Sequence, residues 1–382
     1  MTSKERVYAA LNHTEPDRVP RGENKFDNNF FRGVMGYDTL AYAGWDEMQA
    51  LWDGRRDEVI ADYIRDLPAL AEKLKWDYIR VPPTPKKQSY AGYKRLSDKL
   101  YQHGAGRTFN FNPAVGTISM PKHFNTEMTI ADLGDPDAEI IVDESELEIL
   151  RGIVAAVGHE KFIIAHSPHG GTFPWQSTVG MQEYLMRFIT DPEFCHAAVE
   201  IACRKCIAYC NAYLDAGADA IMISEDWCDN KGLFMGKERF YEFIYPYFKR
   251  IVEAVHAKGG RLIKHSDGIM WDALDTFADL GVDGWHGIQP SIGMHPEKLQ
   301  ERYGGKFCFF GGVNVETIIA GSTEDVRREV RRMVKYCAPG GGLVLACGNI
   351  LEPETKPENA FAMGDELDKI GCYPIDADSI IV

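Results

Sequence analysis

Residues 214–225 read Leu-Asp-Ala-Gly-Ala-Asp-Ala-Ile-Met-Ile-Ser-Glu, and this stretch decides the fold. A long amphipathic segment ends at Asp215-Ala-Gly217, and a short apolar run, Asp219–Ser224, follows at once. A glycine at the end of a helix, followed closely by an apolar strand, is typical of the crossover between parallel strands. The stretch therefore predicts an α/β fold in which a polar residue, Glu225, follows the carboxyl end of a strand.

The same joint between helix and strand recurs along the chain. Helix stops precede apolar runs at Ala257-Lys-Gly-Gly260 and at Leu280-Gly281. The predicted strands from residue 160 onward are Phe162–His166, Asp219–Ser224, Arg261–His265, Gly284–Ile288, Lys306–Phe310 and Gly342–Ala346. Two weaker candidates upstream, Arg18–Gly22 and Asp77–Val81, complete the eight strands that close a TIM (β/α)8 barrel.

Residues 84–160 interrupt the alternation of helix and strand. Tyr93–Leu96 and Arg107–Asn112 have the pattern of antiparallel strands, and Gly104-Ala-Gly106 lies between them. We therefore expect an insertion that contains a hairpin, next to the mouth of the barrel. A TIM barrel tolerates such additions, so we expect one elaborated domain over residues 1–382.

The composition excludes several classes of partner. A chain of 382 residues with 45% hydrophobic content can bury a large core, and its formal net charge of -15 argues against non-specific binding to nucleic acid or to an anionic membrane. We find no apolar run long enough to span a bilayer and no secretion signal at the N-terminus. The nine cysteines lack the spacing of a small disulfide scaffold. We therefore expect a cytoplasmic protein that acts on a small ligand or a protein partner.

Three side chains that can bind a metal lie just past apolar runs: Glu225, His265 and Cys347. Because all strands of a parallel barrel end on the same face, residues far apart in the sequence can converge there. A carboxylate, an imidazole and a thiolate around one open position can hold a catalytic zinc ion. We predict that Zn2+ binds these three residues and acts as a Lewis acid on a leaving oxygen.

A plainer interpretation of these residues remains open. Cys347 could be a small buried hydrophobe, and Glu225 and His265 could be hydrogen-bonded polar residues at strand ends. Asp267, two residues beyond His265, could be a further ligand, a proton acceptor, an acceptor for the imidazole N–H or the cap of the next helix. We expect Asp267 to support the imidazole of His265.

Aromatic and apolar residues gather near the same strand ends and could bind a planar aromatic ligand. These candidates are Phe173, Trp175, Met222, Trp227 and Trp285. Any one of them could instead pack in the core. Cys203, Cys206 and Cys210 share one face of the predicted helix Cys195–Leu214, which favours buried thiols over a second metal site.

Several segments together resemble the uroporphyrinogen decarboxylase superfamily. The segments are Glu15–Pro20, Glu225-Asp226 with Gly232–Met235, His265–Gly268, Gly281–Gly284 through Gln289-Pro290, Phe310–Asn314 and Glu354–Asn359. The resemblance covers most of the chain outside residues 84–160, and it implies a TIM barrel whose site lies at the carboxyl ends of the strands. Within the matching segments, Gln289 and Asn314 are further candidates for substrate contact.

The decarboxylases of this superfamily have features that the chain lacks. They carry an arginine-rich N-terminal loop that binds propionate carboxylates, an Asp on an early strand and a His near the last strand. At these places the chain reads Gly22–Phe31, Val81-Pro-Pro83 and Ala346-Cys-Gly348. An acidic mouth also suits a tetrapyrrole with many carboxylates poorly. The resemblance therefore favours the other branch, the zinc-dependent methyltransferases that exchange methyl groups with corrinoid proteins.

Coenzyme M-type methyltransferases typically have His-x-Cys and a later Cys, and Asp267 replaces the first of these cysteines. The resemblance therefore supports His265 and Cys347 as zinc ligands and leaves the remaining place to Glu225. The pattern looks like the O-demethylase methyltransferases, which implies transfer of a methyl group from a methyl ether, such as an aryl methyl ether, to Co(I) of a corrinoid. The chain has no Asp-x-His-x-x-Gly cobalamin motif, so the corrinoid should arrive on a separate protein.

Alternative functions stay open on this sequence. One is methyl transfer from a methylated corrinoid to a thiol or to tetrahydrofolate, and another is uroporphyrinogen decarboxylation. A third is ligand binding without catalysis. The identity of the methyl donor and the oligomeric state, including a homodimer, are equally open.

Overall fold

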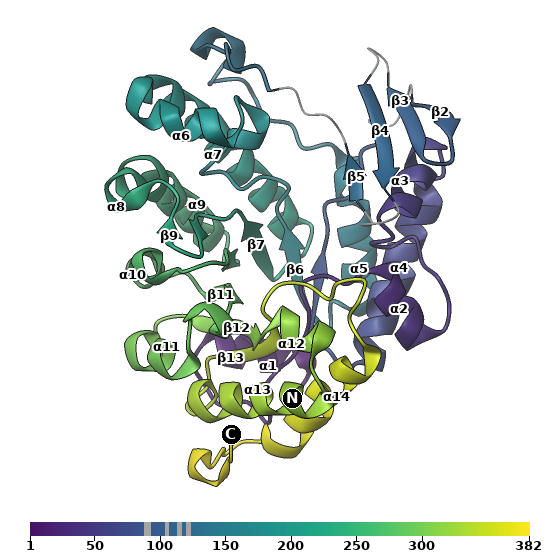
Figure 1. The fold of residues 1–382 in the computed structure, drawn as a ribbon, viewed down its shortest axis with the longest axis vertical. Coiled ribbons are helices and arrows are strands. Elements are labelled where there is room, and N and C mark those ends of the chain that lie inside the picture. Colours follow the sequence, from purple (N-terminus) through teal and green to yellow (C-terminus); the bar gives the residue numbers. More distant parts are fainter. Residues whose placement is uncertain (88–92, 104–106, 113–116, 120–123) are drawn as a thin grey trace.

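A parallel sheet, curled into the wall of a barrel, forms the centre of the computed structural model, which describes residues 1–87, 93–103, 107–112, 117–119 and 124–382 (Figure 1). Its seven strands, in the order in which they pair, are β1 (Tyr78–Val81), β6 (Phe162–His166), β7 (Ala220–Ser224), β10 (Arg261–His265), β11 (Gly284–Ile288), β12 (Cys308–Val313) and β13 (Leu343–Cys347). All pairs are parallel, as the helix–strand joints predicted.

The segment Pro20–Gly22 closes the gap between the edge strands β1 and β13. On one side, the N–H of Gly22 donates to the carbonyl of Leu345 (3.1 Å), and the N–H of Leu345 donates to the carbonyl of Pro20 (2.8 Å). On the other side, the N–H of Asp77 donates to the carbonyl of Arg21 (2.6 Å). The segment thus takes the eighth position and confirms the barrel, although Pro20 has no N–H for a regular ladder.

The observed strands differ from the predicted ones mainly at the last two. The run predicted at Lys306–Phe310 begins two residues later and continues to Val313, because its glycines still pair with β13. Strand β13 includes Cys347, which we had placed just beyond it. Cys347 therefore belongs to the strand face that carries Leu345, whereas Val344 packs in the inner cluster of the barrel.

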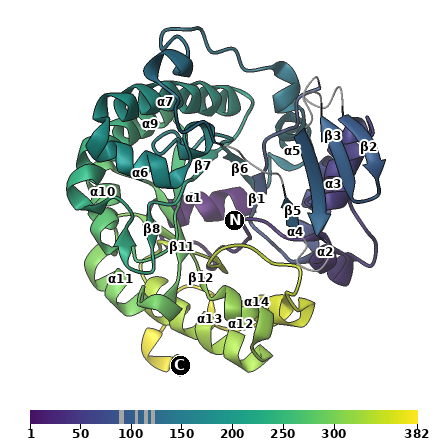
Figure 2. The same ribbon diagram turned by 45° about the horizontal axis from the view of Figure 1, so that its top comes forward.

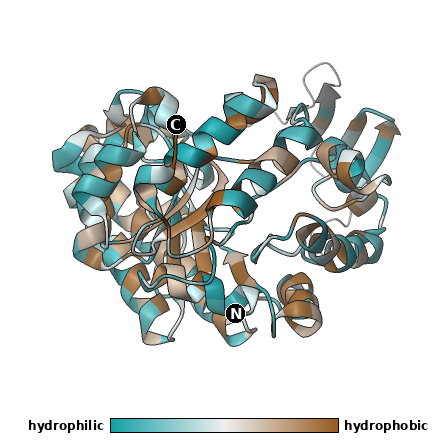
Figure 3. Cartoon of the chain, turned by 90° about the horizontal axis from the view of Figure 1, so that it is seen from below, coloured by the Kyte–Doolittle hydropathy of each residue, from teal (hydrophilic) through white to brown (hydrophobic). Residues whose placement is uncertain are grey.

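Helices cover the outer face of this sheet, with polar residues outward and apolar residues toward the strands (Figure 3). The longer helices are α4 (Arg56–Lys73), α5 (Glu148–Val157), α6 (Met181–Thr190), α7 (Pro192–Asp215), α9 (Tyr245–Ala257), α10 (Trp271–Leu280), α13 (Thr323–Cys337) and α14 (Pro357–Ile370). The shorter ones are α2 (Asn28–Met35), α3 (Trp45–Trp52), α8 (Gly236–Arg239), α11 (Pro296–Tyr303) and α12 (Val315–Ala320). Cys203, Cys206 and Cys210 of α7 are fully buried, as predicted.

Helix α1 (Ser3–Leu11) covers the amino ends of the strands (Figure 2). Its residues Val7, Ala10 and Leu11 pack against the inward side chains of the barrel. The N–H of Lys4 donates to the carbonyl of Glu160 (2.7 Å), just before β6, and the hydroxyl of Tyr8 donates to Asp219 (3.0 Å), just before β7. Because this end is covered, the opposite end of the barrel is the one where ligands can enter.

A buried ion pair fixes α1 to the barrel and gives a first test of the fold. Nη1 of Arg6 lies 2.6 Å from Oδ1 of Asp77, whose side chain is fully buried. Arg6→Ala should lower the free energy of unfolding by about 3 kcal/mol, because it removes one of the cations that compensate a buried carboxylate. Arg32→Ala, which removes an exposed ion pair with Asp38, should cost about 0.5 kcal/mol or less. Urea unfolding measures both, and equal losses in the two variants would contradict the role of Arg6.

The insertion contains a four-stranded antiparallel sheet, which confirms the predicted hairpin. Its strands are β2 (Tyr93–Ser97), β3 (Leu100–His103), β4 (Arg107–Asn112) and β5 (Thr117–Ser119), and the predicted turn at residues 104–106 lies outside the described residues. Tyr101 packs against Trp45 and Trp52 of α3, so the sheet stands against this helix beside the barrel (Figure 2). A short hairpin, β8 (Cys228–Asp229) with β9 (Gly232–Leu233), follows β7. Within the described part of the chain, no helix is long and apolar enough to cross a membrane.

Candidate functional site

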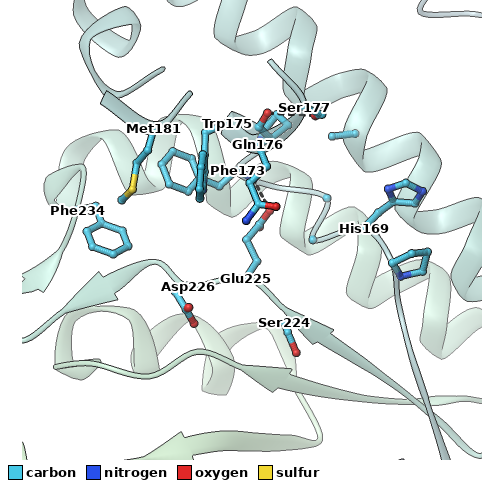
Figure 4. Close-up of a pocket in the computed structure, with 15 residues that line it drawn as sticks. His169, Phe173, Trp175, Gln176, Ser177, Met181, Ser224, Glu225, Asp226 and Phe234 are labelled. Atoms are coloured by element: carbon cyan, nitrogen blue, oxygen red, sulfur yellow. Dashed lines mark hydrogen bonds between the residues drawn. The ribbon is translucent and has the colours of Figure 1, made fainter. Parts of the chain in front are cut away.

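A cavity of about 520 Å³ opens at the carboxyl ends of β6 and β7 (Figure 4). The loop after β6 and the segment Ser224–Asp226 after β7 form its walls. Its large apolar lining residues are Phe173, Trp175, Met181 and Phe234. Glu225 and Asp226 are its two carboxylates, and no Lys or Arg among the described residues lines it. The volume and the aromatic lining are those of a site for a small organic ligand.

The carboxylate of Glu225 is held by the loop after β6 and by Trp227. It accepts hydrogen bonds from the N–H of Thr172 (3.1 Å) and of Phe173 (2.9 Å), from the Thr172 hydroxyl, and from Nε1 of Trp227 (3.4 Å). Gly170 allows this approach, because a Cβ there would overlap the carboxylate. Glu225 therefore positions the cavity loop through both of its oxygens, and its role as a zinc ligand stays a prediction.

Three imidazoles lie at the carboxyl ends of the strands. His265 of β10 and His286 of β11 are partners in register, and their Nδ1 atoms are 2.7 Å apart. Nε2 of His166, in β6, is 2.9 Å from the hydroxyl of Ser224. Burial lowers the pKa of His265 to about 3, so its ring is neutral at neutral pH. When His265 donates its Nδ1–H to His286, its Nε2 carries a free lone pair, the form of imidazole that binds metals.

Cys347 is in contact with an acid that the sequence had not singled out, Glu23. The N–H of Cys347 donates to both carboxylate oxygens of Glu23 (3.1 and 3.2 Å). Burial raises the pKa of Glu23 to about 8 and places that of Cys347 well above its usual range. Because Glu23 forms no ion pair with a described Lys or Arg, a bound cation would stabilise the ionised forms of both groups.

In the structure, the side chains of the predicted zinc ligands do not lie together. No three described His, Cys, Asp or Glu side chains lie close enough together to hold an ion. Glu225 is bound to its loop, His265 lies on the inward face of β10, and Cys347 lies on the other face of its strand beside Glu23. The donors nevertheless match zinc in kind, because Glu23, Cys347 and His265 supply a carboxylate, a thiol and an imidazole.

Asp267 and Gln289 line a separate hollow of about 400 Å³. Oδ2 of Asp267 accepts a hydrogen bond from Asn349 (2.8 Å), and burial raises the pKa of Asp267. The imidazole of His265 therefore pairs with His286 and not with Asp267, which differs from our expectation. Helix α10 begins only at Trp271, so Asp267 is not its cap either.

Several predicted substrate contacts lie in the core instead. Met222, Trp227 and Trp285 are fully buried, and the indole N–H of Trp285 donates to the carbonyl of Ser266 (2.9 Å). Asn314 is held by Glu329 and accepts from the N–H of Ser291 (3.0 Å). Of the predicted aromatic residues, Phe173 and Trp175 line the cavity. The other two, Trp227 and Trp285, are packed in the core.

Lys264 binds backbone carbonyls at the ends of β7 and β10, and the sequence analysis did not single it out. Its ammonium group donates to the carbonyls of Glu225 (2.5 Å) and His265 (2.8 Å), and it lies 4.3 Å from the ring centroid of Trp227. Burial lowers its pKa to about 8. Its position directly before His265 in a strand was visible in the sequence, and so was the inward position of His286. The position of Glu23, just after the eighth barrel segment, was visible as well.

The chain matches a known family over most of its length. A family model described as uroporphyrinogen decarboxylase (URO-D) matches residues 102–370. The uroporphyrinogen decarboxylase of Ralstonia pickettii is 25% identical over 261 residues, 64% of this chain and 68% of the relative. That of Thioalkalivibrio sulfidiphilus is 28% identical over 186 residues, 47% of this chain and 50% of the relative. The chain thus spans about half to two thirds of the length of these curated relatives.

A solved structure shares the fold over nearly the whole chain. A methyltransferase from Methanosarcina mazei superposes with a TM-score of 0.70, covers 97% of this chain and 99% of its own, and is 20% identical. At this identity the likeness concerns the fold alone. The chemistry of the site has to be argued from the residues described above.

Proposed function

The chain belongs to the uroporphyrinogen decarboxylase (URO-D) family, and we propose that it is a methyltransferase within this family. In this proposal it moves a methyl group from a methyl ether, such as an aryl methyl ether, to the Co(I) centre of a separate corrinoid protein. The products are the free hydroxyl compound and the methylated corrinoid. The cavity at the carboxyl ends of β6 and β7 is the proposed site for the ether.

The lining of the cavity carries this proposal. Aromatic and thioether side chains surround about 520 Å³, and the charged lining consists of Glu225 and Asp226 without a described Lys or Arg. A tetrapyrrole with many carboxylates would meet like charges there, whereas a methoxylated ring would find apolar surfaces to stack on. The cavity therefore favours an ether over uroporphyrinogen.

We assign the proposed zinc ion to Glu23, His265 and Cys347. These residues do not line the cavity themselves, so the ether oxygen would have to extend from the cavity toward them. When bound there, zinc would polarise this oxygen and so help the hydroxyl compound to leave. The backbone N–H of Cys347 holds the carboxylate of Glu23 next to this residue, and the neutral ring of His265 is the third proposed ligand. Binding zinc requires both the Cys347 and the His265 side chains to turn toward each other. Glu225 is replaced in this role, because its oxygens hold the cavity loop.

The residues of the chain itself orient and shield the substrate. Trp175 and Phe234 offer flat surfaces on the cavity wall, and the loop that Glu225 holds keeps Phe173 and Trp175 in place. His286 fixes the ring of His265 through the Nδ1–Nδ1 hydrogen bond. No protein nucleophile is required, because the corrinoid partner supplies the nucleophile from the open mouth of the barrel.

Decarboxylation of uroporphyrinogen is the second candidate, since the curated relatives carry that activity in their names. One assay separates the two. Purified protein is incubated with methoxylated aromatic compounds and a reduced corrinoid protein, and in parallel with uroporphyrinogen. We expect equal amounts of methylated corrinoid and free phenol, and no reaction when the corrinoid protein is left out. Release of CO2 from uroporphyrinogen, without demethylation of any ether, would replace the proposal by the second candidate.

A further inference from the structure

We infer that the cavity at the carboxyl ends of β6 and β7 binds an organic cation, so that the methyl donor is an aryl methyl ether that carries an ammonium group. This inference rests on the proposed function for the reaction, but the binding site follows from the lining of the cavity alone. Two features of that lining carry it: the carboxylate of Asp226, and the aromatic walls that enclose the same space.

Asp226 is a carboxylate of the cavity that is free to bind a ligand. It lies two residues beyond the end of β7, is exposed, and lines the cavity. Among the described residues its side chain has no hydrogen-bond or ion-pair partner, whereas the neighbouring Glu225 is held by the cavity loop. An exposed ion pair contributes little to binding by itself, so a cation needs further contacts in the same cavity.

Aromatic side chains supply these contacts. Trp175 and Phe234 are half-buried, so each ring keeps an accessible surface, and both line the cavity together with Phe173. Figure 4 shows Trp175 above Asp226, with Phe234 at the side. The face of an aromatic ring attracts a cation electrostatically, and that of tryptophan does so most strongly. Ring faces and a free carboxylate in one cavity therefore favour an organic ammonium ion over a neutral ligand of the same shape.

The charges around the cavity leave a negative excess. Lys264 interacts with both carboxylates, since the charges of Glu225 and Asp226 raise its pKa, although burial, the larger effect, lowers it to about 8. Its ammonium group already binds two backbone carbonyls and does not line the cavity. His169 lines the cavity, but burial lowers its pKa, so it adds no positive charge at neutral pH. Two carboxylates are thus balanced by one buried ammonium group, and a cleft of this kind concentrates cations.

Ser224 and Asp226 mark the inner and the outer end of the cavity. Ser224 shares a face of β7 with Met222, which packs in the inner cluster of the barrel, and its register partner is His265. Asp226 lies two residues later, and two residues of extended chain span at most about 7 Å. A single ring between the aromatic walls can therefore direct its ether oxygen past Ser224 toward His265 and its ammonium group toward Asp226. A carboxylate in place of the ammonium group would meet a like charge.

Calorimetry with probes that differ in charge tests this without any methyl transfer. The zinc-reconstituted protein is titrated at neutral pH with 3-methoxybenzylamine, a cation, with the neutral 3-methoxybenzyl alcohol and with the anion 3-methoxybenzoate, and methylammonium serves as a free cation. We expect the amine to bind at least about fivefold more tightly than the alcohol, and the benzoate most weakly. Asp226→Asn should remove most of this preference and leave alcohol binding unchanged. Asp226→Glu should keep it, because the carboxylate remains.

The controls separate the site from the overall charge and from the reaction. Asp279→Asn removes the same charge at an exposed position of α10 outside the cavity, so it should bind every probe like the wild type. Equal binding of amine and alcohol, tighter binding of the benzoate, methylammonium binding as tight as that of the amine, or a preference that survives Asp226→Asn would each overturn the inference. Amine binding that depends on Asp226, without demethylation in the assay above, would instead reject the proposed reaction and retain the site. Demethylation of neutral ethers by a protein that binds all three methoxylated probes equally would retain the reaction and reject the cation site.

Discussion

Cys347→Ala is expected to lose nearly all bound zinc and at least about a thousandfold of the methyl-transfer rate, while it keeps the fold. The thiolate is the strongest zinc donor among the assigned ligands, and Cys347 is fully buried at the end of β13 in contact with Glu23. Without it, Glu23 and His265 remain as two weak ligands from different segments. A loss of several kcal/mol in the stabilisation of the leaving oxygen corresponds to the expected change in rate.

Another buried thiol provides a matched control for this variant. Cys337 of α13 is 1% exposed, and its thiol donates to the carbonyl of Pro296 on the outside of the barrel. Cys337→Ala removes the same atom and creates a similar small cavity, so both variants should lose similar stability. Only Cys347→Ala should lose metal, as measured by elemental analysis after reconstitution. One zinc per chain in Cys347→Ala would show that Cys347 is a core residue, the plainer interpretation of the sequence.

The fold could be predicted from the sequence because its signals are local. The apolar runs that end at His166, Ser224, His265 and Ile288 give the observed strand ends, and each is bounded by polar or glycine-containing joints. The eighth position was harder, because Pro20 lies within Pro20–Gly22 and allows only a few bridging hydrogen bonds. That segment forms no regular strand, yet it brings Glu23 beside Cys347.

The site could be predicted only in part, because a strand end does not fix the direction of the next side chain. Glu225 follows β7 as predicted, but the Thr172-Phe173 loop supplies donors that hold its carboxylate at the cavity wall. Trp227, two residues later, packs against Phe240 and Phe248 instead of lining the cavity. These outcomes depend on long-range contacts between loops, which spacing along the sequence does not contain.

The alternation of side chains along a strand could have revealed more. In β11, His286 is the register partner of His265, and in β1, Arg80 follows Tyr78 on the same face. Both lie at positions that alternation assigns to the barrel interior. A polar residue at such a position needs a partner, and only the three-dimensional structure shows that Nη1 of Arg80 binds Tyr42 while its Nε has no acceptor among the described residues.

Glu23→Gln and Glu225→Gln are expected to give opposite results, and this pair decides the third zinc ligand. Glu23→Gln should lose most of the bound zinc, because a neutral amide replaces a charged ligand beside Cys347. Glu225→Gln should keep zinc, but its NH2 group would replace one of the two acceptor oxygens, lose the hydrogen bond from Thr172 or from Phe173, and so loosen the cavity loop. Substrate affinity should therefore fall while metal content stays normal. Loss of zinc in Glu225→Gln alone would restore Glu225 as the ligand.

The metal-free protein offers an independent measurement on the same carboxyl group. Burial raises the pKa of Glu23 from 4.5 to about 8, so between these pH values the folded state holds a proton that the unfolded chain has released. The stability of the metal-free wild type should therefore fall as the pH rises through this window, by at most about 1.4 kcal/mol per pH unit from this group. Glu23→Gln should lack this part of the slope, whereas Glu225→Gln should retain it. Zinc binds the ionised carboxylate, so adding zinc to the wild type should offset the loss at pH 8 and leave Glu23→Gln nearly unchanged. Urea unfolding at several pH values measures each curve, and identical slopes for wild type and Glu23→Gln would mean that Glu23 is not buried as an acid beside Cys347.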